Sequence, residues 1–218
     1  FHFEAFIPLT LLMGYFFSER GKHFSAWGWF ALALACCEFT PIIVGSFGLY
    51  YTIKGLMPKV LKRGDANRKQ ILHGITLIIV SFAWLTLALN IVHSINPYVK
   101  VAGHWDKWGK NVGEIMLNLI ARPLEAVAFM LTREKLLYPV YLMATLAFIP
   151  LAAPLETCLL AGSWILPAWL SGFTGYYGGI LHPQFQYAGF VVAQVFIALI
   201  CGLKNLGLKR KTLLKVTS

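Results

Sequence analysis

The sequence predicts an all-α fold: a polytopic transmembrane helix bundle with about six membrane segments, some of them broken by proline. Two observations carry this prediction. Of the 218 residues, 58% are hydrophobic and only 13% are charged, whereas a typical soluble domain is about one-quarter charged. The polar intervals between the apolar runs are also short, so we expect one integral membrane domain over residues 1–218 and no separate soluble domain.

The membrane segments are predicted from apolar runs, because about 20 apolar residues are needed to cross the hydrocarbon core of a bilayer. Four runs meet this requirement clearly: 1–17, 25–53, 70–95 and 187–203. Two further regions can be interpreted in more than one way. They are 112–132, which contains charged residues, and 136–172, which contains four prolines.

The basic residues predict the orientation, because cationic connections stay on the cytoplasmic side of a membrane. The connection 54–69 contains six Lys and Arg residues, and the tail from residue 204 contains five. We therefore expect both on the cytoplasmic or equivalent side of a bacterial inner membrane or an organelle membrane. The N-terminus is expected on that side too. The connections 18–24, 96–111 and 173–186 are then expected on the opposite side.

Two arrangements of residues 112–172 satisfy this orientation. In the one we favour, 112–132 crosses inward, 132–135 turns at the inner surface, and 136 to about 160 crosses outward. In the alternative, 112–132 lies along the outer surface and 136–172 forms a hairpin. The arms of that hairpin, about 15–17 residues each, are short for the hydrocarbon thickness.

Polar side chains form a stripe in the run 112–132. At about 100° per residue, they fall within roughly 80° of one another on a helix: Glu114, Asn118, Arg122 and Glu125. A charge in mid-membrane costs on the order of 2.5–3.5 kcal/mol, so we expect this face to turn to the bundle interior. Arg122 and Glu125 can pair with each other at i,i+3. The stripe is therefore either a structural ion pair or a site for protons, an anionic headgroup or a quinone carbonyl.

Two further carboxylates stand in apolar runs near prolines. Glu38 lies three residues before Pro41, and Glu156 lies two residues after Pro154. Neither has a basic residue nearby in the sequence. Each is either a neutral acid that hydrogen-bonds across helices or the partner of a distant base, and prolines can expose carbonyls to such a pocket. We include both in the predicted proton-handling or ligand-lining pocket.

The histidines are candidates for metal and haem binding. His73 and His93 stand 20 residues apart on one predicted helix, about 30 Å by the helical rise. The two histidines are therefore too far apart to bind one haem together, and each would need a second histidine at its own depth in the membrane. At the predicted outer surface, imidazoles and a carboxylate could bind copper or zinc: His23, His93, His104, Asp106 and His182. The alternative is a scatter of interfacial histidines.

The sequence contains no Ser/His/Asp set, HExxH motif or nucleotide-binding loop, which argues against a self-sufficient enzyme. We expect an integral membrane subunit of a larger energy-transducing complex, respiratory or electron-transporting. Its buried Glu and Arg residues would handle protons or line a quinone or lipid pocket. Expected partners are other membrane subunits and anionic lipid headgroups, and not nucleic acid. A proton- or cation-coupled secondary transporter is the alternative, followed by a membrane metal-site oxidase or a lipid-modifying enzyme.

Overall fold

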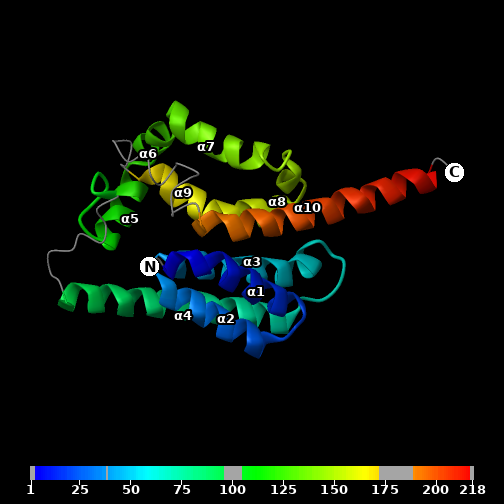
Figure 1. Cartoon of the computed structure of the whole chain (residues 1–218), viewed down its shortest axis with the longest axis horizontal. Coiled ribbons are helices and arrows are strands. Elements are labelled where there is room, and N and C mark those ends of the chain that lie inside the picture. The colour runs from blue at the N-terminus through cyan, green and yellow to red at the C-terminus, as the bar shows by residue number, and fades with distance from the viewer. Residues whose placement is uncertain (1–2, 38, 96–104, 172–188, 217–218) are drawn as a thin grey trace.

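The computed structural model describes residues 3–37, 39–95, 105–171 and 189–216. All secondary structure in these ranges is helical, which confirms the prediction of an all-α fold. Figure 1 shows two groups of helices beside each other, α1–α4 and α7–α10, with α5 and α6 at one end. We call this end the cap end.

The first group is formed by the N-terminal half of the chain. Its elements are η1 (Phe3–Phe6), α1 (Ile7–Glu19), α2 (His23–Cys36), α3 (Thr40–Val60) and α4 (Arg68–Ile95). Helices α3 and α4 make the closest contact, because glycines remove side chains from their crossing. A Cβ atom on Gly74 would lie only 2.5 Å from the carbonyl oxygen of Gly48.

The second group contains shorter and more irregular helices. Its elements are α5 (Val112–Ala121), α6 (Pro123–Met130), α7 (Arg133–Ala144), η3 (Ile149–Ala152), α8 (Pro154–Glu156), the single π-helical turn η4 (Thr157–Ala161), α9 (Gly162–Leu170) and α10 (Gly189–Val216). A shared core of buried apolar residues joins the two groups. Phe39, next to α3, packs against Trp164 and Phe190, and those two rings lie 4.5 Å apart.

Two of the described helices are long and apolar enough to cross a membrane: Arg68–Val92 in α4 and Gly189–Gly207 in α10. They correspond to the predicted segments 70–95 and 187–203. The count of about six segments is not confirmed. Helices α1 and α2 have 13 and 14 residues, so each is only about 20 Å long.

The predicted segment 25–53 is two helices and not one. The chain leaves α2 at Cys37 in an extended conformation, and α3 begins at Thr40 with Pro41 in its first turn, a position that suits a residue without an N–H group. Because the chain reverses its direction between α2 and α3, the connections 18–24 and 54–69 meet at one end of the bundle. Lys54 Nζ lies 2.7 Å from the Glu19 carboxylate. The prediction that these connections lie on opposite sides of the bilayer is therefore wrong.

We call the end where these two connections meet the basic end. The C-terminal half of α10 also lies there, since the Asn205 side chain donates to the Ala152 carbonyl and Cys201 contacts Tyr15 of α1. The first described element, η1, lies at the cap end (Figure 1). The side of the membrane on which each terminus lies stays a prediction.

The region 112–132 does not form one helix either. It breaks at Arg122, whose backbone is non-helical (φ −128°, ψ 56°), because the following Pro123 disfavours a helical conformation at the residue before it. The segment then folds back, so that Lys107 Nζ lies 4.1 Å from the centre of the Phe129 ring. A crossing segment would hold these residues far apart, so the favoured arrangement is wrong.

Residues 133–171 instead form the hairpin of the alternative arrangement. Trp169 Nε1 donates to the Lys135 carbonyl at 2.7 Å, and Lys135 Nζ donates to the Ser171 carbonyl at 3.2 Å. Both ends of the hairpin therefore lie at the cap end. The side chain of Lys135 is fully buried and lies over the Phe129 ring. Burial, followed by the nearby Lys107 ammonium, lowers the pKa of Lys135 to about 8.

Candidate functional site

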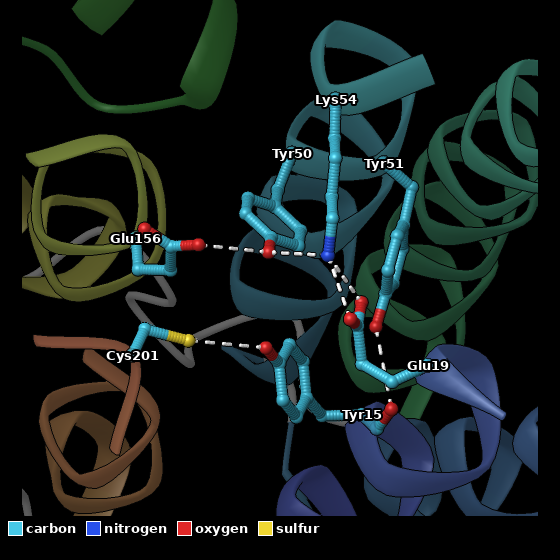
Figure 2. Close-up of polar contacts among 7 residues, drawn as sticks. All are labelled: Tyr15, Glu19, Tyr50, Tyr51, Lys54, Glu156 and Cys201. Atoms are coloured by element: carbon cyan, nitrogen blue, oxygen red, sulfur yellow. Dashed lines mark hydrogen bonds and ion pairs between the residues drawn. The ribbon is translucent and has the colours of Figure 1, made fainter. Parts of the chain in front are cut away.

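A continuous series of polar side chains connects α1, α3 and α8 near the basic end (Figure 2). Lys54 Nζ donates to both carboxylate oxygens of Glu19 at 2.7 Å and to the Tyr50 hydroxyl at 3.1 Å. The Tyr50 hydroxyl donates in turn to Glu156 Oε1 at 3.0 Å. We call these four residues the polar chain. Hydrogen bonds join each residue of the polar chain to the next, so the chain links two carboxylates that are 137 positions apart in the sequence.

Local structure explains how each group reaches this place. Tyr50 and Lys54 are four residues apart on α3 and so project from the same helix face. Glu19 is the last residue of α1, and Glu156 ends the single turn α8. The side chains of Lys54 and Glu19 are 31% and 34% exposed, whereas Tyr50 is fully buried. The polar chain therefore runs from the partly exposed ion pair through buried Tyr50 to Glu156, which is itself partly exposed.

Two further tyrosines and a cysteine surround the polar chain (Figure 2). The Tyr15 hydroxyl lies 3.4 Å from Cys201 Sγ, which brings α10 to the site. The Tyr51 hydroxyl donates to the Tyr15 carbonyl at 3.5 Å. The rings of Tyr15, Tyr50 and Tyr51 lie 5.1–6.5 Å from one another, so they form an aromatic wall beside the ion pair.

Two histidines meet on the other side of Tyr51. The His23 and His73 rings lie 4.5 Å apart, and Ser18 Oγ lies 3.0 Å from His73 Nε2. The prediction placed these histidines at opposite surfaces, and their contact shows that this placement is wrong. In the part of the chain that the structure describes, no three His, Cys, Asp or Glu side chains are grouped closely enough to bind a metal ion.

Of the other predicted metal and haem ligands, the structure describes the side chain of Asp106. Asp106 lies at the cap end, next to Trp105, whose indole donates to the Pro167 carbonyl. The structure therefore does not bring Asp106 and His23 together. The side chains of the remaining three ligands lie outside the described residues: His93, His104 and His182.

The first half of the predicted stripe has a local structural role at the cap end. The Glu114 N–H donates to the Asn111 side chain at 2.9 Å, and Glu114 Oε2 accepts the Lys110 N–H at 2.9 Å. Asn118 Nδ2 donates to the Trp108 carbonyl at 2.7 Å. These bonds fix the loop that precedes α5.

The second half of the stripe lies on the surface of the chain. Arg122 Nη1 lies 3.8 Å from Glu125 Oε2, and Lys107 Nζ lies 3.4 Å from Glu125 Oε1. The side chains of Arg122 and Glu125 are 64% and 45% exposed. The expectation that they face the bundle interior therefore differs from the structure. Glu38 lies outside the described residues.

An apolar groove of about 570 Å³ runs along α3 between α4 and α9. Small residues such as Gly45 and Gly162 line it together with larger ones such as Phe82. At one end its lining includes Leu49 and Cys158, which are close in sequence to Tyr50 and Glu156 of the polar chain.

A family model described as predicted membrane protein (DUF2079) matches residues 1–217. The chain belongs to this family. Comparisons with curated proteins and with solved structures give no match. The family and the two apolar helices together support an integral membrane protein with a helical fold.

Of the predicted site residues that the structure describes, Glu156 joins the polar chain of this DUF2079 protein. Lys54 belongs to the basic connection 54–69 from which the orientation is predicted, and Glu19 and Tyr50 are not among the predicted site residues. The i,i+4 spacing of Tyr50 and Lys54, which places both on one helix face, is the signal that could have indicated their contact. The partner of Glu156 is a neutral hydroxyl and not the distant base that we considered for it.

Proposed function

We propose that this protein is an integral membrane subunit of a larger energy-transducing complex, and that its polar chain transfers protons. One observation carries the proposal: an unbroken series of hydrogen bonds leads from a partly exposed ion pair, Glu19 and Lys54, through buried Tyr50 to Glu156. Ionisable residues inside helical membrane proteins commonly mark proton and ion pathways.

The polar chain contains two acidic groups, Glu19 and Glu156, and one basic group, Lys54. When all three are charged they carry one excess negative charge, which one proton would neutralise.

The geometry permits the transfer itself. A tyrosine hydroxyl can accept one hydrogen bond and donate another at the same time, and Tyr50 does both. A proton that passes from the Lys54 ammonium to the Tyr50 oxygen is matched by the Tyr50 proton that passes to Glu156. Lys54 is then neutral and regains a proton from the solvent at the partly exposed ion pair with Glu19.

Proton flux into liposomes tests this proposal. The protein, with any subunits that co-purify, is reconstituted around a pH-sensitive dye, and a pH gradient is applied. Loss of a hydrogen bond to a charged group costs about 1.5–3 kcal/mol, which corresponds to roughly a ten- to hundredfold lower rate. We expect this decrease for Tyr50→Phe and Glu156→Gln.

The matched control is Tyr51→Phe. It removes a hydroxyl from the same aromatic wall, but that hydroxyl donates only a long bond, to the Tyr15 carbonyl. We expect its flux to equal that of the unmodified protein. Unchanged flux in folded Tyr50→Phe and Glu156→Gln would contradict the proposal. Equal flux in liposomes with and without the protein would contradict it as well.

The apolar groove favours a second candidate function, a pocket for the tail of a quinone or lipid. Its volume is within the usual range of about 300–1,000 Å³ for ligand pockets, and its lining is close in sequence to the polar chain. Gly45→Leu would fill the groove. We expect this variant to lose a quinone or lipid that co-purifies with the unmodified protein, as measured by solvent extraction and mass spectrometry.

A further inference from the structure

The segment with α5 and α6, residues 105–130, covers one end of the bundle, and we call it the cap. Two indole N–H groups attach it to the end of α9. Trp105 Nε1 donates to the Pro167 carbonyl at 2.9 Å, and Trp108 Nε1 donates to the Leu170 carbonyl at 2.8 Å. These two contacts hold the cap against the end of α9.

The two faces of the cap differ in chemistry. On the polar side, Glu114, which is exposed, and Asn118, which is partly buried, are held by hydrogen bonds to residues 108–111. On the outer face, large apolar side chains have no cover in the described structure, among them Ile120 and Leu124, which are 73% and 84% exposed. Helices with one polar and one apolar face lie in the plane of a membrane surface, with the apolar face toward the acyl chains.

A positive charge stands among these apolar side chains. Lys107 and Arg122 share one carboxylate, Glu125, at 3.4 Å and 3.8 Å, so this group of three carries one excess positive charge. The Arg122 guanidinium has five N–H donors, and its side chain is 64% exposed. Its immediate neighbours in sequence, Ala121 and Pro123, are uncharged, and Glu125 is the carboxylate paired with it.

We propose that the cap lies in the headgroup layer of the membrane and that Arg122 binds the phosphate of an anionic phospholipid there. Guanidinium groups suit this ligand because their planar fork matches the oxygens of a phosphate. Ile120 and Leu124 on either side of Arg122 contact the acyl chains of the same leaflet. The site is at the opposite end of the bundle from the polar chain and does not depend on the proposed proton transfer.

Lipid retention tests the phosphate site. The full chain is purified in detergent, incubated with equal amounts of phosphatidylglycerol and phosphatidylcholine, and analysed by native mass spectrometry. A basic residue near an anionic surface contributes about 1 kcal/mol, so we expect Arg122→Gln to bind roughly fivefold less phosphatidylglycerol. The matched control, Arg133→Gln, removes an exposed arginine that the proposal does not use, and we expect it to bind phosphatidylglycerol normally.

Three results would overturn the phosphate site. They are equal retention of the two lipids by the unmodified protein, equal retention of phosphatidylglycerol by Arg122→Gln, and an equal loss in Arg133→Gln. Millimolar inorganic phosphate is expected not to displace the lipid, because the acyl chains contribute to its binding. Displacement would show that the site takes free phosphate and would overturn the choice of a lipid.

The depth of the cap is tested separately in liposomes. A fluorophore attached to Leu124→Cys, in a variant whose native cysteines are replaced by serine, is expected to be quenched by lipids with a shallow spin label and protected from aqueous iodide. Quenching by iodide with no effect of the spin-labelled lipids would overturn the placement. The circular dichroism of each variant shows whether its helices are retained.

Discussion

The crossing of α3 and α4 makes a quantitative prediction for Gly74→Ala. Alanine favours a helix over glycine by about 1 kcal/mol, so propensity alone would make this substitution stabilising. At Gly74, however, the new Cβ would lie 2.5 Å from the Gly48 carbonyl oxygen and 2.6 Å from the Thr52 nitrogen. Both are backbone atoms and cannot rotate away, so the two helices must separate by on the order of 1 Å to restore normal contact distances.

The cost of this separation exceeds the gain in propensity. Overpacking a core typically costs about 1–3 kcal/mol, and contact with two backbone atoms places Gly74→Ala at the upper end of that range. We expect a net loss of about 1–2 kcal/mol. For a chain of this size, each kcal/mol lowers the midpoint of thermal unfolding by roughly 2–4 °C. The midpoint is measured by circular dichroism of the purified protein in one detergent.

The matched control is Gly28→Ala in α2. No atom lies within 4 Å of the Cβ that this substitution would add, so only the helix propensity changes. We expect the midpoint to stay the same or to rise by up to about 4 °C. If Gly74→Ala is as stable as Gly28→Ala, the close approach of α3 and α4 is wrong.

Two further predictions concern the arrangement of the chain and the buried lysine. Lys22 and Arg63 are each replaced by a single cysteine in a variant without the native cysteines. Both cysteines should react with a membrane-impermeant maleimide from the same side of sealed vesicles. Labelling from opposite sides would restore a single crossing by residues 25–53. Because the pKa of Lys135 is lowered to about 8, the folded state binds fewer protons than the unfolded state between about pH 8 and pH 10, so stability should rise with pH in this window. Unfolding midpoints at pH 7, 8.5 and 10 should rise with pH in the unmodified protein but not in Lys135→Met. An equal rise in both proteins would show that another group causes the pH dependence.

The sequence predicts the two long apolar helices well. Segments 70–95 and 187–203 correspond to α4 (68–95) and α10 (189–216). Neither run contains a proline, so each apolar run forms one continuous helix; α10 continues 13 residues beyond the predicted end at 203. Where prolines or charges interrupt an apolar run, length alone does not predict how the chain folds.

The region 25–53 shows why. An apolar run of 29 residues is long enough for one tilted crossing, and hydrophobicity does not distinguish that crossing from two shorter helices packed together. The topology that followed placed Glu19 and Lys54 on opposite sides of the membrane, so their ion pair could not be expected. Periodicity describes neighbours within one helix, whereas Tyr50 and Glu156 meet through the packing of α3 against α8.

The meeting of the connections 18–24 and 54–69 affects how the protein acquires its orientation during insertion. Together with the tail from residue 204, these segments contain 13 of the 19 Lys and Arg residues, and all three lie at one end of the bundle. Each of them separately opposes translocation of that end. We therefore expect that neutralising any one segment leaves the other two to direct insertion.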